Sequence, residues 1–190
     1  MKDADPGVCF LYRVLFYDCI PLAKRVTNPV TGRPVNYAIS DIYKYRTSVF
    51  EQLKSQRKVA LRLGKLKDNG GWQIKASLTK KLINEEKGIN DLDAKDVVYQ
   101  VQQKGVDMKI GLDIASLAYK RLVDQIILIA GDTDFVPAAK VARREGIDFI
   151  LDPMHNMIDT SLNEHIDGLR STSPKGGCSN IEDFIKRTNR

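Results

Sequence analysis

Cysteine, histidine and long apolar runs are scarce in this sequence, and each scarcity argues against a class of protein. The 190 residues include three cysteines, two histidines and one tryptophan. An odd number of cysteines, without paired short spacings or histidines at zinc-ligand intervals, disfavours a disulfide framework and a zinc finger. No stretch reaches the roughly 18 apolar residues of a membrane span, and the N-terminal region lacks the pattern of a signal peptide. We therefore expect a soluble protein of the reducing cytoplasm.

Positive charge is in excess, and it is concentrated in one segment. Thirty Lys and Arg against 24 Asp and Glu give a formal net charge of +6 and a pI of about 9.2, which favours a polyanionic partner. Between residues 44 and 67 the only acidic residue is Glu51, and the aromatic Tyr43, Tyr45 and Phe50 lie near the start. The basic residues of this segment are Lys44, Arg46, Lys54, Arg57, Lys58, Arg62, Lys65 and Lys67. This basic segment can bind phosphates by charge and stack bases on its aromatic rings. Alternatively, it is a solvated helix face followed by an edge strand.

Apolar periodicity predicts an alternation of strands and helices. In the first half we expect a strand at 10–18, a loop at 19–36, a helix at 40–56, a strand at 58–67, a turn at 68–72 and a short helix at 91–103. In the second half we expect a helix from about Met108, a strand at 125–130, a helix at 135–145 and a strand at 147–151. Strand, helix and strand in that order predict a right-handed crossover between parallel strands, so the fold class is α/β with a doubly wound sheet.

The length and the pattern favour one domain with a tail. A chain of 190 residues can bury one sizeable core. We assign residues 1–170 to that domain and residues 171–190 to a linker and a C-terminal helix, because "STSPKGGCSN" has loop composition and "IEDFIKRT" has helical periodicity.

Two carboxylates follow the apolar run of residues 126–130. Asp132 and Asp134 come directly after the predicted strand, at the carboxyl end where open parallel sheets gather functional groups. Two neighbouring carboxylates repel each other unless a cation compensates them, and Mg²⁺ typically binds through one or two carboxylates plus water and phosphate. The alternative is that Asp134 caps the following helix and Asp132 is a turn residue.

Two further acids belong to the helix that precedes this strand. Asp107 lies at the helix start and Asp113 lies within it, on a polar stripe that also contains Lys109. Lys109 and Asp113 are otherwise an ordinary pair at four-residue spacing, and Asp107 is otherwise a cap. Because the two acids are six residues apart, about 120° around a helix, both cannot lie centrally on one face. We expect one of them to lie outside the inner shell of any metal.

The segment from "KGVDMKIGLDIASLAYKRL" through "IILIAGDTDFVPAAK" to "IDFILD" closely resembles the core of the NYN domain family of PIN-like ribonucleases. The resemblance covers roughly residues 100–152, with Thr133 in place of a more usual Ser. It implies a PIN-like three-layer sandwich with a mainly parallel central sheet, bound Mg²⁺ or Mn²⁺, and RNA as substrate. It places Asp107, Asp113, Asp132 and Asp134 at the family's acidic, metal-binding and catalytic positions.

Under this resemblance the chain is a metal-dependent ribonuclease that hydrolyses phosphodiester bonds. The metal lowers the pKa of the attacking water, and Lys and Arg side chains guide the RNA backbone. The candidate RNA-binding residues are Arg57, Lys58, Arg62, Lys65 and Lys109.

One departure from the family pattern concerns the N-terminus. NYN domains normally open with a strand ending in an acidic metal ligand, and "MKDADPGV" before Cys9 contains no apolar run. We therefore expect the usual first strand to be missing, which would weaken the metal site and leave a gap in the sheet. If another copy of the chain fills that gap, the protein is a homodimer. The alternative function is a catalytically impaired module, derived from a nuclease, that binds RNA or a protein.

Other chemistry is less well supported by the sequence. His155 and His165 lack a partner motif, and Trp72 is expected to pack over a turn more readily than to stack on a base. An Asp-x-Asp phosphatase or sugar transferase is chemically plausible. In a phosphatase of the haloacid-dehalogenase type, however, that motif follows the first strand, whereas here it lies two thirds along the chain.

Overall fold

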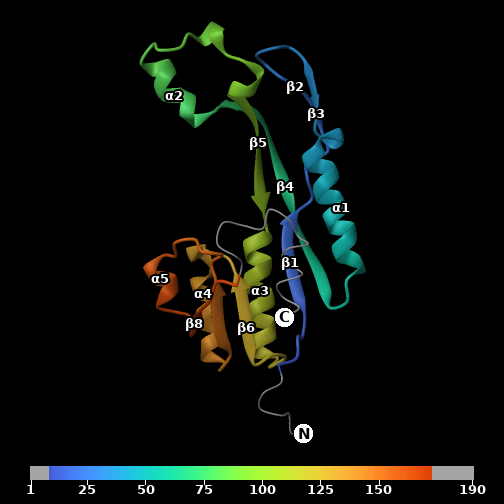
Figure 1. The fold of residues 1–190 in the computed structure, drawn as a ribbon, viewed down its shortest axis with the longest axis vertical. Helices are drawn as coiled ribbons and strands as arrows, with labels where there is room; N and C mark the ends of the chain where they lie inside the picture. The colour runs from blue at the N-terminus through green and yellow to red at the C-terminus, as the bar shows by residue number, and fades with distance from the viewer. Residues whose placement is uncertain (1–8, 173–190) are drawn as a thin grey trace. The chain divides into compact units, whose positions relative to one another are not determined.

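The computed structural model describes residues 9–172, which form two compact units that divide between Val106 and Asp107. The predicted C-terminal helix and the segment before Cys9 therefore lie outside the described residues. Within the described range, no helix has the length and apolar character needed to cross a membrane. The class is α/β, as predicted (Figure 1).

The first unit is built on a three-stranded sheet with the order β1-β4-β5. Its strands and main helices are β1 (Val14–Cys19), β2 (Arg25–Thr27), β3 (Pro34–Asn36), α1 (Asp41–Ser55), β4 (Val59–Ile74), α2 (Ala76–Ile83) and β5 (Val97–Lys104). β1 and β4 are parallel, from Val14 opposite Val59 to Cys19 opposite Gly64. β4 continues far beyond the end of β1 and pairs there with antiparallel β5, so this part of the sheet is a two-stranded ribbon.

Helix α1 forms where the sequence predicts it. Ser40 is its N-cap, and the Ser40 side chain accepts a hydrogen bond from the backbone N–H of Tyr43. Phe50 is the buried residue of the helix. The loop predicted at 19–36 is partly regular, since β2 and β3 pair as a short antiparallel hairpin.

Two predictions in the first unit are wrong. Residues 68–72 do not end the strand: they form an irregularity inside β4, and pairing resumes with Trp72 opposite Tyr99. Residues 97–104 are strand β5, and the helix predicted at 91–103 is replaced by short 3-10 turns at Ile89–Asp91 and Ala94–Asp96 followed by this strand. Val97 and Tyr99 are buried while Val98 is 42% exposed, which is the alternation of a strand.

The second unit contains the predicted strand, helix and strand crossover. Its elements are α3 (Val106–Tyr119), which begins at the unit boundary, β6 (Gln125–Ile129), the 3-10 turn η4 (Thr133–Phe135), α4 (Val136–Arg144), β7 (Asp148–Asp152), α5 (Thr160–Asn163) and β8 (Gly168–Leu169). β6, β7 and β8 form a parallel sheet in that order. Parallel pairing is therefore present in both units, and β4–β5 is the antiparallel exception among the longer strands.

Strand β7 is the centre of the second core. Phe149 and Leu151 are fully buried, as are Ala139 and Ala142 of α4. Gly146 ends this helix at φ +81°, a conformation that glycine adopts without steric cost.

Strand β6 is an edge strand in the described structure, because β7 is its single neighbour among residues 9–172. Leu128 is buried, whereas Ile127 and Ile129 are each 59% exposed. One face of this apolar run is therefore exposed.

Candidate active site

Asp132 caps the turn that follows β6. Its backbone is extended (φ −89°, ψ 138°), and its Oδ1 accepts a hydrogen bond of 3.1 Å from the backbone N–H of Asp134. Asp132 is therefore the capping residue, whereas the sequence suggested Asp134 for that role. Asp134 lies within η4, so the two carboxylates are not both on extended backbone.

Both carboxylates are exposed and lie on one turn. No Lys or Arg of residues 9–172 forms an ion pair with either of them. Two exposed oxygen donors at the end of a parallel strand are a donor set that suits a hard divalent cation completed by water or phosphate.

Asp107 and Asp113 lie on α3, in the same unit. Asp107 is exposed in the first turn, and Asp113 is half-buried about 1.7 turns later. The buried positions of α3 are Val106, Ile110, Ile114 and Ala118, an i, i+4 stripe. Both acids therefore lie outside the buried stripe of the helix, and for Asp113 the polar stripe in the sequence predicts this.

The four candidate acids do not form a complete metal-binding cluster. Among residues 9–172, no group of three or more His, Cys, Asp and Glu side chains could hold a metal ion. Mg²⁺ usually takes only one or two protein carboxylates, and Asp132 and Asp134 can supply them. The roles of Asp107 and Asp113 stay predictions.

Asp152 is a further carboxylate at the carboxyl end of this sheet, and it is the last residue of β7. It is opposite Ile129, the last residue of β6, and it is 2% exposed. Its oxygens accept hydrogen bonds from Met154 N (2.8 Å), Thr172 N (3.0 Å) and Thr172 Oγ1 (2.6 Å). Burial raises the pKa of Asp152, but these hydrogen bonds outweigh burial and hold the pKa below its ordinary value. Asp152 therefore anchors the segment after β8 instead of offering free oxygens to a ligand.

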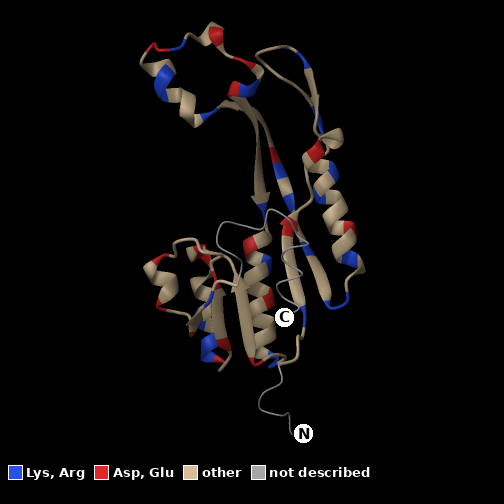
Figure 2. Cartoon of the chain, in the orientation of Figure 1, with Lys and Arg blue, Asp and Glu red and all other residues tan. Residues whose placement is uncertain are grey.

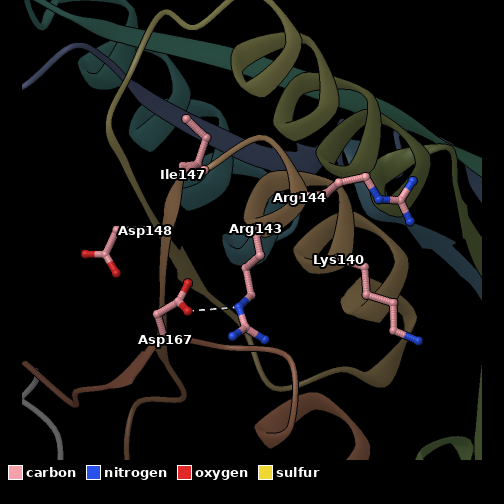
Figure 3. Close-up of a pocket in the computed structure, with 7 residues that line it drawn as sticks. Lys140, Arg143, Arg144, Ile147, Asp148 and Asp167 are labelled. Carbon is pink, nitrogen blue, oxygen red and sulfur yellow. Dashed lines mark hydrogen bonds and ion pairs between the residues drawn. The ribbon is translucent and has the colours of Figure 1, made fainter.

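The second unit also has a cavity of about 580 Å³ at its other end. Lys140, Arg143 and Arg144 from α4 and Asp148 and Asp167 line it (Figure 3). Arg143 Nε donates to Asp167 Oδ1 at 2.8 Å. Asp148 begins β7, where Asp152 ends it, so the cavity is remote from the acidic turn.

The candidate RNA-binding residues do not form one patch. Arg57 and Lys58 precede β4, and Lys58 donates to the carbonyl of Leu11. Lys65 lies beyond Gly64, the last β4 residue paired with β1. Six residues of extended strand, about 20 Å, separate Val59, which follows Lys58, from Lys65. Figure 2 shows basic residues on both strands of the β4–β5 ribbon.

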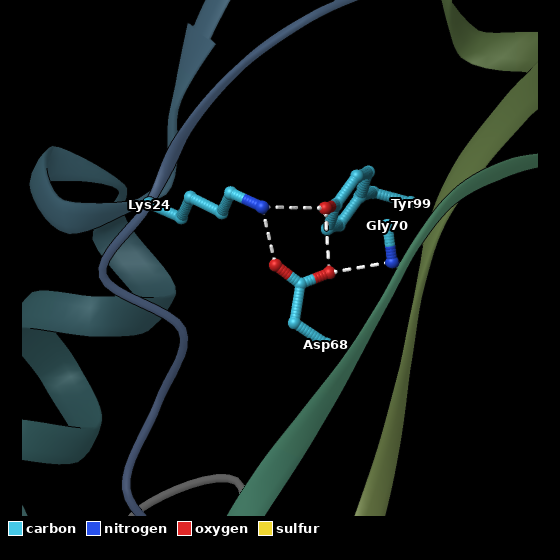
Figure 4. Close-up of polar contacts among 4 residues, drawn as sticks. All are labelled: Lys24, Asp68, Gly70 and Tyr99. Atoms are coloured by element: carbon cyan, nitrogen blue, oxygen red, sulfur yellow. Dashed lines mark hydrogen bonds and ion pairs between the residues drawn. The ribbon is translucent and has the colours of Figure 1, made fainter.

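Trp72 packs in the ribbon, as expected from the sequence, but beside Tyr99 and not over a turn. The two rings meet edge to face with centroids 5.5 Å apart. Tyr99 also joins a polar network with Asp68, Lys24 and Gly70 (Figure 4). Hydrogen bonds from Lys24, Tyr99 and the Gly70 N–H lower the pKa of Asp68 to about 2.

The parallel crossover, with carboxylates following its first strand, places the chain in a class of α/β domains that gather acids at the ends of strands. The family model of the NYN domain matches residues 34–164, so the chain belongs to the NYN domain family. NYN domains are PIN-like α/β folds of a nuclease-type, RNA-acting family. No curated protein and no solved structure gives a significant match.

Proposed function

We propose that this chain is a metal-dependent ribonuclease that hydrolyses RNA phosphodiester bonds at the turn after β6. The observation that supports this most directly is the pair Asp132 and Asp134, exposed and without a basic partner among residues 9–172, in an NYN domain. Their oxygens suit Mg²⁺ or Mn²⁺.

In this proposal Asp132 and Asp134 hold the cation, with Asp107 and Asp113 of α3 as further acids. A bound divalent ion would lower the pKa of the attacking water and neutralise charge on the phosphate. The hydrogen bond from Asp134 N to Asp132 Oδ1 fixes the Asp132 carboxylate and leaves its second oxygen for a ligand. Exposure of the turn lets an RNA strand approach it.

Five basic residues are proposed to position the RNA backbone without reading sequence: Arg57, Lys58, Arg62, Lys65 and Lys109. Lys58 already donates to the Leu11 carbonyl, whereas Lys65 forms no ion pair among residues 9–172.

The first experiment is Asp132→Asn, because this substitution removes the negative charge of the side chain and keeps its shape. Asn is as good an N-cap as Asp, so the hydrogen bond to Asp134 N and the stability of the fold should persist. We expect RNA cleavage with added Mg²⁺ or Mn²⁺ to fall by at least about 100-fold, the scale of losing an electrostatic catalytic group.

The matched control is Asp148→Asn, which removes an exposed carboxylate at the other end of the same sheet. Its cleavage rate should equal that of the unchanged protein. Undiminished cleavage by Asp132→Asn, with normal folding by circular dichroism, would refute the metal role of Asp132.

A second candidate function is a non-catalytic module that binds RNA or a protein. The observation that favours it is that residues 9–172 contain no ready group of three metal-binding side chains. RNA binding without cleavage at any Mg²⁺ or Mn²⁺ concentration would select this alternative.

A further inference from the structure

We infer that one face of the β4–β5 ribbon is a binding surface for the phosphate backbone of single-stranded RNA, formed by Lys65, Lys67 and Lys104. The inference of this lysine face rests on the proposed action on RNA. It adds Lys104, which lies outside the basic segment 44–67, and it places Lys67 of that segment beside Lys65.

The register of the ribbon puts these lysines together. Lys65 is directly opposite Lys104, and Lys67 is opposite Gln102. Directly opposite residues of antiparallel strands share a face, with Cβ atoms about 4.5–5.5 Å apart. Residues two apart on one strand also share a face. All three ammonium groups therefore lie on the same side of the ribbon.

This arrangement is unfavourable for the free protein. Like charges directly opposite each other destabilise a sheet, and Lys65, Lys67, Gln102 and Lys104 are all exposed. No carboxylate of residues 9–172 forms an ion pair with the three lysines.

The acidic residues that the strand pairing brings nearest to the three lysines already have other partners. Asp18, opposite Leu63 on the same face, is bound by Arg46 of α1. Asp68 is directly opposite Val101 and so lies on the other face, where Lys24 and Tyr99 hold it. An uncompensated triplet that lowers the stability of its own sheet is explained by a polyanion that neutralises it on binding.

The spacing favours a single RNA strand over a duplex. Positions on the face are about 4.8 Å apart across the strands and about 6.8 Å apart along one strand. A flexible single strand can bring neighbouring phosphates to these positions, whereas an A-form duplex presents its phosphates in a fixed array. Lysine ammonium groups act as point charges on phosphate and provide no base-reading fork.

The test compares Lys65→Gln, Lys104→Gln and the double variant with Lys54→Gln. Lys54 is a matched control, since it is an exposed lysine of the same unit whose charge is already paired with Glu51 at 2.6 Å. The probe is a fluorescein-labelled, unstructured oligouridylate in EDTA, so that binding is measured by anisotropy without cleavage.

Two readouts should move in opposite directions. Each of Lys65→Gln and Lys104→Gln should bind RNA several-fold more weakly and flatten the slope of log affinity against log salt by about 0.7. Each should also raise the urea midpoint of unfolding, because repulsion is relieved. The second substitution should add little further stability, since the repulsion requires both charges. Lys54→Gln should leave affinity and salt slope unchanged.

Each outcome decides between the two proposals. RNA binding that depends on the two lysines supports the lysine face even if the protein cleaves nothing, in which case the ribonuclease proposal alone fails. Unchanged affinity and salt slope in the double variant overturn the lysine face, whether or not the protein cleaves RNA. Loss of binding with a lowered urea midpoint overturns it too, because the lysines are then structural.

Discussion

The aspartates of this protein differ in how many hydrogen bonds their carboxylate oxygens already accept. Asp68 and Asp152 accept several hydrogen bonds each and have lowered pKa values. Asp132 accepts one, from the backbone of its own turn, and keeps ligand capacity. The sequence identified Asp132 and Asp134 correctly as residues that follow a strand. It could not reveal that Asp152 is occupied, because two of its three hydrogen bonds come from Thr172, twenty residues further along the chain.

The Asp68 network gives a pH prediction at this scale. The Lys24 hydrogen bond is the largest cause of the low pKa of Asp68, about 2 against an ordinary 3.8. Because the folded-state pKa lies below the unfolded value, the stabilisation is complete above about pH 3.8 and is lost as the pH falls through about 2. Lys24→Gln should therefore raise the pKa of Asp68 toward 3.8, measured by NMR titration of its carboxyl carbon.

Lys95→Gln is the control for this measurement. Lys95 forms an exposed pair with Asp93 at 3.6 Å and does not contact Asp68. An Asp68 pKa that stays near 2 in Lys24→Gln would assign the shift to Tyr99 and Gly70 instead.

At the scale of elements, local periodicity predicted most helices and strands, and the failures have identifiable causes. Asp91 and Asp93 are of a residue type that often caps the start of a helix. Asp93 is an N-cap in the structure, but of a 3-10 turn of only three residues. Long-range pairing with β4 then makes β5 a strand. In "DNGGW" the turn chemistry is real, since Asp68 Oδ1 accepts from Gly70 N at 2.8 Å. The turn is nested in a strand because β5 continues to pair beyond it.

Gly64 lies at the junction where β1 ends and the ribbon begins, and its substitution tests how closely β4 and β5 approach each other there. A Cβ at this position would lie 2.7 Å from the Lys104 carbonyl oxygen and 2.7 Å from Val106 Cγ2. Backbone oxygen cannot move aside without shifting β5, so Gly64→Ala should lower the free energy of unfolding by about 1–3 kcal/mol. Urea denaturation measures the change.

Gly71→Ala is the matched substitution in the same strand, because a Cβ there meets no atom within 4 Å. It should cost much less than Gly64→Ala. Equal effects at the two positions would mean that the close approach at Gly64 is not what constrains the residue.

On the scale of the whole molecule, charge is divided between the two units. Met1–Val106 contains nineteen Lys and Arg against eleven Asp and Glu, whereas Asp107–Arg190 contains eleven against thirteen. The lysine face belongs to the first unit, and all four candidate catalytic acids belong to the second. Composition alone predicted a polyanionic partner. It could not place the lysine face and the candidate acids in different units, because that division depends on how the chain folds.

Binding and cleavage should therefore respond to different conditions. Chelation of divalent ions with EDTA should abolish cleavage and leave RNA affinity intact. Raising monovalent salt from about 50 to about 200 mM should weaken binding by about 20-fold if three phosphates are contacted. Anisotropy titrations and gel assays on the full chain measure the two effects. An affinity that does not change with salt, or that EDTA abolishes, would contradict this division.

The exposed flank of β6 gives the acids beside it an additional role. An uncovered apolar strand edge is a template for self-association into aggregates. Asp124 and Asp132, both exposed, stand directly before and shortly after this strand, where charges act as gatekeepers against such stacking. The Asp132 carboxylate proposed to hold a cation is thus also placed to oppose such stacking, and Asp132→Asn removes one of these two flanking charges.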